Sequence, residues 1–100
     1  MAIAEVSIVP LGTGTPSVSK YVATAIKVLQ REKGVSYGIN PMGTTIEGDV
    51  DSILRVVGKM HESVFENGAA RVLTTIKIDD RRDKPLSAEG KLSSLKKKLE

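Results

Sequence analysis

The chain has 100 residues, enough for one domain with a single hydrophobic core. It contains no cysteine and one histidine, which excludes disulfides, thiolate metal sites, a cysteine nucleophile and a histidine-rich metal site. The net charge of +3 comes from residues 84–100, with five lysines and two glutamates, because residues 1–83 hold ten basic and ten acidic residues. This neutral domain and its three aromatic residues argue against a nucleic-acid partner.

Residues 2–11 predict a strand, because apolar side chains alternate with positions that carry a charge and a hydroxyl. The glycine-rich residues 12–17 predict a loop. This loop is a weak version of a phosphate-binding turn, and a plain turn that leads into a helix is favoured. Thr15 or Ser17 is the expected N-cap of a helix that reaches about residue 33. The expected apolar stripe of this helix consists of Val18, Val22, Ala25, Ile26 and Leu29.

A second strand is expected over residues 35–39, and the stretch after it lies between two halves with the same order of elements. This stretch, residues 41–49, follows an Asn-Pro turn signal, because proline fixes φ and restricts the residue before it. It continues as a short strand and ends where the next helix begins. We expect it to line any ligand site, because it carries Glu47, two hydroxyls and a thioether beside backbone that glycine leaves uncovered.

The second half of the chain predicts a helix, a strand and a last helix. Asp49 or Asp51 is expected to cap the first of these helices at the positive end of its dipole. Its expected apolar stripe consists of Val50, Ile53, Leu54, Val57, Met60 or His61, and Val64. Residues 71–79 alternate clearly and predict the last strand. Ser87 is expected to cap a final helix that reaches about residue 99.

The resulting order is β-α-β-β-α-β with an additional C-terminal helix. Two split βαβ units of this length predict an α+β ferredoxin-like sandwich, in which a four-stranded antiparallel sheet carries two helices on one face. The first and third strands are expected to be central neighbours, with the fourth strand beside the first. The ferredoxin-like domain would occupy residues 1–83, and residues 84–100 would form a charged C-terminal helix or tail.

One face of this sheet has no helix to cover it. By the alternation of side chains, this face carries a mainly polar set of residues: Glu5, Ser7, Ser36, Thr45, Glu47, Thr75 and Lys77, with Ile3, Val9 and Leu73 among them. Two interpretations stay open. The face is either solvated, with weak cross-strand ion pairs, or it packs against a second copy of the chain, which would bury more surface of a small domain.

No group of residues in the sequence indicates catalysis. No Ser/His/Asp set, pair of catalytic carboxylates or cluster of metal ligands stands out. His61 falls on or beside the apolar stripe of its helix, which indicates a partly buried structural histidine rather than a catalytic base.

Four segments resemble those of the small thiamine-binding protein family, in the same order. They are EVSIVPLGT at residues 5–13, SVSKYV at 17–22, MGTTIEG at 42–48 and RVLTTIKIDDRRD at 71–83. The resemblance covers nearly the whole chain. It implies a ferredoxin-like fold, subunits that pair through their sheets, commonly as homotetramers, and thiamine or its pyrimidine part as the ligand. It implies no established enzymatic activity.

A site for thiamine needs carboxylates or hydroxyls for the cationic thiazolium and the aminopyrimidine, together with an apolar wall. The expected polar ligand-binding residues are Glu5, Ser7, Ser17, Ser19, Thr44, Thr45 and Glu47, and the expected wall consists of Tyr21, Tyr37 and Met42. No catalytic residue, metal ligand or cofactor is expected, apart from thiamine as a ligand.

The sequence therefore predicts a non-catalytic protein that binds thiamine or a related pyrimidine precursor and forms a homodimer or homotetramer. The alternative is a structural or regulatory oligomer whose uncovered sheet face serves mainly for assembly. A small enzyme that acts on a thiamine precursor is a third interpretation. A cytoplasmic protein without a membrane partner is expected, because no apolar run approaches the roughly 20 residues of a membrane span and the N-terminus does not resemble a signal peptide.

Overall fold

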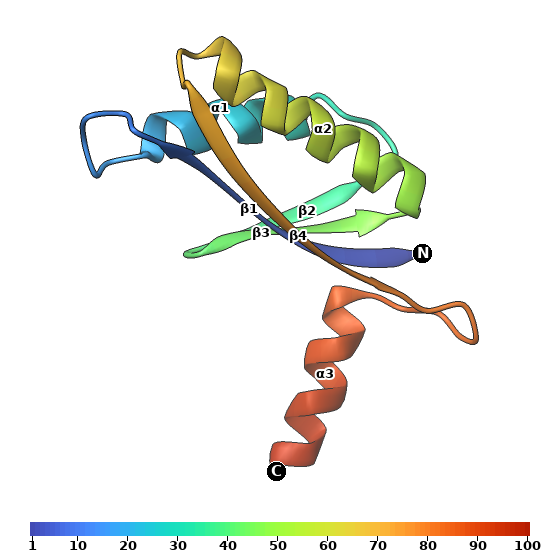
Figure 1. The fold of residues 1–100 in the computed structure, drawn as a ribbon. Helices are drawn as coiled ribbons and strands as arrows, with labels where there is room; N and C mark the ends of the chain where they lie inside the picture. Colours follow the sequence, from blue (N-terminus) through green and yellow to red (C-terminus); the bar gives the residue numbers. More distant parts are fainter.

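The computed structural model describes residues 1–100 and confirms the predicted order of elements. The strands are β1 (Ala2–Leu11), β2 (Ser36–Asn40), β3 (Gly43–Gly48) and β4 (Arg71–Asp80), and the helices are α1 (Ser19–Gln30), α2 (Val50–Glu66) and α3 (Ala88–Leu99). The strands form one antiparallel sheet in the order β2-β3-β1-β4. Helices α1 and α2 lie on one side of the sheet and α3 lies on the other (Figure 1). This is the predicted ferredoxin-like sandwich with a C-terminal helix.

The strand register decides which side chains share a face of the sheet. Ala4 lies opposite Ile46, and both are buried beneath the helices. Glu5, the next residue, lies opposite Thr45 on one side and Lys77 on the other. These three residues belong to the face that α1 and α2 leave uncovered, which we call the open face. The predicted assignment of residues to the two faces is therefore confirmed, although Glu5 and Lys77 form no ion pair.

The hydrophobic core lies between the sheet and the two helices, and it is mainly aliphatic. On α2 the predicted stripe was wrong at one position, because Val56 is fully buried whereas Leu54 is 49% exposed. Val56 follows Ile53 by three residues and precedes Met60 by four, so it shares their side of the helix. Leu54 stands about 100° away from Ile53 around the helix axis and faces solvent.

Helix α1 begins later than the sequence predicts. Its first residue is Ser19 and its N-cap is Val18, which provides no side-chain hydrogen bond to the helix. The predicted caps, Thr15 and Ser17, were therefore wrong. The Thr15 hydroxyl instead accepts a hydrogen bond from the Ser17 backbone N–H at 3.3 Å, within a local turn. Such turns compete with helix capping for the same hydroxyl, which explains the delayed start.

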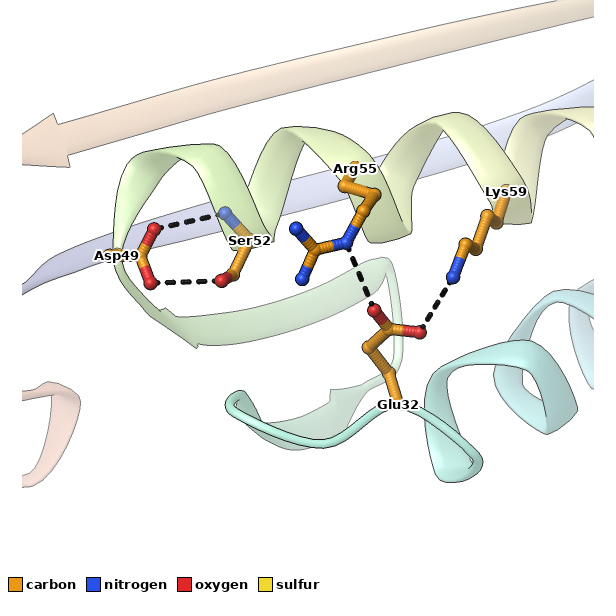
Figure 2. A network of polar contacts seen from close by, with 5 residues as sticks. All are labelled: Glu32, Asp49, Ser52, Arg55 and Lys59. Carbon is orange, nitrogen blue, oxygen red and sulfur yellow. Dashed lines mark hydrogen bonds and ion pairs between the residues drawn. The ribbon is translucent and has the colours of Figure 1, made fainter.

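Polar contacts fix both ends of the connection between α1 and α2 (Figure 2). Glu32, just after α1, accepts hydrogen bonds from Lys59 at 3.1 Å and from Arg55 at 3.4 Å on α2. The hydrogen bond from Lys59 is the main cause that holds the pKa of Glu32 below its usual value, and Arg55 adds to it. Asp49 is the N-cap of α2, as one of the two predictions had it, and it accepts hydrogen bonds from the backbone N–H and the hydroxyl of Ser52. These bonds lower the pKa of Asp49.

Helix α3 is tied to the rest of the molecule only through its first turn. Ser87 caps it, as predicted. The Ala88 backbone N–H donates a hydrogen bond of 3.1 Å to Glu47, and Lys91 forms an ion pair of 2.5 Å with Asp79. None of its residues is buried. None of the three helices combines the length and the apolar composition that crossing a bilayer requires.

Candidate functional site

A cleft opens at one end of the sheet, between the start of α1 and the turn that joins β2 to β3. Its volume is about 330 Å³, and ten of its fifteen lining residues are hydrophobic. The lining includes Val6 and Ile8 from β1, Val22 and Ile26 from α1, and Met42 from the turn. Small-molecule sites in proteins have this size range and this predominance of apolar side chains. The cleft is therefore the candidate ligand site.

Strand β1 extends past the end of β3 beside this cleft. The pairing of the two strands stops at Val6 and Thr44, although β1 continues to Leu11. A Cβ atom at Gly43 would lie 2.9 Å from the Val6 carbonyl oxygen, so this carbonyl points toward β3. Backbone groups alternate in direction along a strand, so the N–H and C=O of Ile8 point to the same side of β1 as the Val6 carbonyl. At Ile8, however, no residue of β3 lies opposite, because β3 begins only at Gly43. One donor and one acceptor of the backbone therefore border the cleft without a strand partner.

The polar side chains of the cleft are Ser7, Asn40 and Thr44, and no charged side chain lines it. Thr44 is 6% exposed and its hydroxyl forms no hydrogen bond with the protein, yet no fully buried side-chain oxygen lacks a partner. The Thr44 hydroxyl is therefore open to the cleft. Asn40 donates a hydrogen bond of 2.8 Å to the Thr45 hydroxyl across the β2–β3 hairpin, which fixes the turn. The cleft is neutral and offers hydrogen bonds.

Three of the ten predicted ligand-binding residues line this cleft: Ser7, Met42 and Thr44. Met42 lies at the tip of the turn and is 90% exposed, so its thioether is free to close over a ligand. Ser17 lies in the exposed loop before α1, and Ser19 is the exposed first residue of that helix. Neither of these serines lines the cleft.

The two tyrosines predicted for the wall lie outside the cleft. Tyr21 is 7% exposed and belongs to the hydrophobic core, where Lys20 lies 5.0 Å from its ring centre. Tyr37 lies on the edge strand β2, opposite Ile46. The apolar wall of the cleft is aliphatic instead.

The remaining three predicted residues, Glu5, Thr45 and Glu47, share the open face. Glu47 is three residues from Thr44, the lining residue of β3 that is nearest to it, which places it about 10 Å along the strand from the cleft. Its carboxylate already accepts the hydrogen bond from the first residue of α3. Glu5 is nearer, because its Cγ would lie 3.8 Å from a Cβ atom at Gly43. The structure therefore does not gather the ten residues into one site, and Glu5 is the carboxylate nearest to the cleft among them.

The sequence interpretation missed the contribution of α1 to the site. Val18 and Val22 were expected in the core stripe of this helix, but both line the cleft, and Val22 is 40% exposed. No pattern in the sequence marks these valines as cleft residues. The difference depends on the tertiary structure: near the start of α1, strand β1 continues without β3 beside it, so these valines have less sheet to cover.

A wider and more polar hollow of about 750 Å³ lies between the loop after β4 and the start of α2. Its two arginines are each paired with a carboxylate: Arg81 with Asp83 at 2.6 Å and Arg82 with Asp80 at 2.8 Å. These hydrogen bonds lower the pKa of Asp83 and of Asp80. Because the guanidinium groups already have carboxylate partners, this hollow is a poor site for an anion.

His61 takes part in packing between α2 and β4. Its Nδ1 lies 2.6 Å from the Thr74 hydroxyl, and its ring meets Phe65 edge-on with 5.3 Å between the ring centres. It is partly buried, as predicted, and it does not line the cleft. No three histidine, aspartate or glutamate side chains lie close enough together to hold a metal ion.

Comparison with known proteins gives several full-length matches. The UPF0045 protein YqgV of Bacillus subtilis is 48% identical over 103 residues, which cover 100% of this chain and 99% of that protein. The solved structure of a hypothetical protein from Methanocaldococcus jannaschii is 44% identical with a TM-score of 0.86, over 94% of each chain.

A third match concerns the fold alone. The solved structure of a Thermotoga maritima protein, whose description suggests a role in thiamine biosynthesis or salvage, has a TM-score of 0.75 at 23% identity. The match covers 94% of this chain and 97% of that one.

A family model described as "Thiamine-binding protein" matches residues 4–96. With nearly the whole chain matched and close relatives of the same length, this protein belongs to the thiamine-binding protein family.

Proposed function

We propose that this protein is a non-catalytic binding protein for thiamine or a related pyrimidine precursor, and that it forms oligomers through its open face. The proposal rests mainly on the neutral cleft beside β1. This chain belongs to the thiamine-binding protein family, which makes thiamine or its pyrimidine part the first ligand to consider for that cleft. The expected cytoplasmic location is part of the same proposal.

The chemistry of the cleft suits an aminopyrimidine ring. This ring is flat and uncharged, and it carries an amino donor and ring-nitrogen acceptors at its edge. The free backbone N–H and C=O of Ile8 and the hydroxyl of Thr44 offer the complementary groups. Val22 and Ile26 offer apolar surface to the ring face. Apolar walls with a few oriented polar groups are typical of sites that bind small heterocycles.

The cationic thiazolium of thiamine would extend out of the cleft, because no charged side chain lines the interior. Glu5 is the nearest predicted carboxylate and is exposed to solvent. An exposed ion pair contributes at most about 1 kcal/mol, so the pyrimidine supplies most of the proposed affinity. The isolated pyrimidine alcohol should therefore bind nearly as well as thiamine.

Calorimetric titration of thiamine, and of its hydroxymethylpyrimidine fragment, into the purified protein tests this proposal. We expect saturable binding near one ligand per subunit, with the ligand recovered chemically unchanged. Val22→Phe should fill the cleft and abolish the heat, whereas Leu54→Phe, which places the same aromatic side chain on the exposed side of α2, should leave it intact. No heat from either ligand, with a stable oligomer present, would favour the alternative of a structural or regulatory oligomer. Turnover of either ligand would favour an enzyme.

A further inference from the structure

Two methionines line the cleft in very different surroundings. Met42 belongs to the turn between β2 and β3 and is 90% exposed, whereas Met60 comes from the buried side of α2 and is 2% exposed. The third methionine, Met1, is 67% exposed and lines the other, more polar hollow. Because the chain contains no cysteine, these thioethers are its only sulfur atoms. Met42 is thus the exposed sulfur group of the cleft.

Exposure decides which of the two cleft methionines an oxidant reaches first. Hydrogen peroxide transfers one oxygen atom to a thioether sulfur, which gives methionine sulfoxide and leaves water. This transfer requires direct contact between the peroxide and the sulfur atom. The Met42 side chain stands in solvent, whereas Met60 is part of the hydrophobic core. We therefore expect Met42 to be oxidised well before Met60.

The backbone holds Met42 at the mouth of the cleft. Asn40 donates its hydrogen bond of 2.8 Å to Thr45 across the hairpin, and Gly43 lies directly against the Val6 carbonyl oxygen. These two contacts fix the turn, and the exposed side chain of Met42 adds little packing to it. Oxidation of Met42 should therefore change the chemistry of the mouth without unfolding the turn.

A sulfoxide at the mouth competes with a ligand for the few hydrogen-bond donors of the cleft. Its oxygen makes the side chain polar, whereas a thioether sulfur is only a weak acceptor. The free donors of the cleft are the Thr44 hydroxyl and the Ile8 backbone N–H, which the proposed ligand also needs. If the sulfoxide stays in water instead, the side chain no longer covers the ligand with apolar surface. Both arrangements weaken ligand binding.

We propose that Met42 is a reversible oxidation site through which peroxide lowers the ligand affinity of the cleft. In the reduced protein, the flexible thioether side chain closes over the bound ring. In the oxidised protein, the sulfoxide keeps the mouth polar and the ligand dissociates more easily. A methionine sulfoxide reductase with a dithiol restores the thioether, and the oxygen leaves as water while the dithiol becomes a disulfide. This inference rests on the proposed function and adds control by oxidation to it.

Peptide mapping by mass spectrometry after a short treatment with hydrogen peroxide tests the selectivity. We expect the Met42 peptide to gain one oxygen atom while the Met60 peptide stays unchanged. The free energy of unfolding in urea should stay that of the untreated protein, because the added oxygen lies in solvent. Saturating thiamine should slow the oxidation of Met42 several-fold and leave that of Met1 unchanged, since Met1 does not line the cleft.

Calorimetric titration of thiamine into treated and untreated protein tests the effect on affinity. The oxidised wild type should bind about five- to tenfold more weakly, as expected for one poorly solvated polar group at the mouth. Met42→Leu keeps an apolar side chain of similar volume, and peroxide should not change whatever affinity this variant has. Met42→Gln carries a permanent polar group and should bind more weakly than the wild type before any treatment. A methionine sulfoxide reductase with dithiothreitol should restore the oxidised wild type and leave Met42→Gln as it was.

The outcomes separate this inference from the proposed ligand. Thiamine binding that keeps its full affinity after Met42 is oxidised would overturn the inference and leave the proposed function in place. An equal loss in peroxide-treated Met42→Leu would overturn it too, because the loss would then come from another residue. Oxidation of Met60 as fast as that of Met42 would overturn the selectivity. No heat from the untreated protein would overturn the proposed function and this inference together.

Discussion

Gly43 and Val6 touch so closely that no side chain fits between them: a Cβ atom at Gly43 would lie 2.9 Å from the Val6 carbonyl oxygen. Gly43→Ala must therefore push the β2–β3 turn away from β1 and widen the cleft. We expect a loss of about 1–3 kcal/mol in the free energy of unfolding, typical of overpacking, and a thiamine affinity at least about tenfold lower. Denaturant unfolding and calorimetry measure the two effects. Gly38→Ala is the control, because a Cβ atom there meets nothing within 4 Å.

Thr44 and Thr45 are neighbours in β3 that face opposite sides of the sheet, which makes them a matched pair for locating the ligand. Thr44→Val keeps the shape of the side chain and removes the hydroxyl that is open to the cleft. Loss of one hydrogen bond of about 0.5–1.5 kcal/mol should weaken thiamine binding by roughly two- to tenfold. Thr45→Val, which removes only the acceptor of the Asn40 side chain at the turn, should weaken binding less than Thr44→Val in the same calorimetric titration. The reverse order of effects would place the ligand on the open face.

Glu47 is expected to act on α3 and not on the ligand. Glu47→Ala removes the acceptor of the Ala88 N–H, so amide hydrogen exchange at the start of α3 should become faster. Glu47→Gln keeps an acceptor oxygen and should restore part of the protection. The thiamine affinity of both variants should stay within about twofold of the wild type, because Glu47 lies about 10 Å along β3 from the cleft. A strong loss of affinity in Glu47→Gln would return this carboxylate to the binding site.

Val56 and Leu54 test the corrected orientation of α2. Val56→Ala removes two buried methyl groups and should lower the free energy of unfolding by about 2–3 kcal/mol, including the cavity that remains. Leu54→Ala removes more atoms from a half-exposed side chain and should cost less than about 1 kcal/mol. Urea unfolding of both variants measures the difference. Equal losses would mean that both side chains pack in the core.

Glu32 links stability to pH through Lys59 and Arg55. Its pKa is lowered in the folded state, first by the hydrogen bond from Lys59, so its contribution is present above the unfolded pKa and is lost as the pH falls through the folded pKa. Between about pH 5 and pH 3, the wild type should therefore lose more stability than Glu32→Gln. Glu66→Gln, at an exposed glutamate of α2 without an ion pair, should follow the wild type. Thermal unfolding at several pH values gives the comparison, and parallel curves for all three proteins would contradict it.

The sequence by itself determined the elements, their order and the face of the sheet to which each strand residue belongs. The alternation in β1 and β4 has a period of two, and that of α1 and α2 has a period near 3.6, so the local pattern alone separates strand from helix. The right-handed crossover then left one leading topology, and the structure has it. The sequence also predicted that residues 41–49 would line any ligand site, and Met42 and Thr44 of this stretch line the cleft.

Only the tertiary structure decided where along the strands the site lies. Alternation assigns Glu47 and Glu5 to the same face, but it contains no information about strand register or about where a neighbouring strand ends. The register places Glu47 opposite Ile3, next to the first turn of α3. Strand β3 begins only at Gly43, which leaves the edge of β1 exposed at Ile8. The cleft exists because β1 continues past the residues that pair with β3. How far each strand of a sheet extends depends on packing between segments that are distant in the sequence.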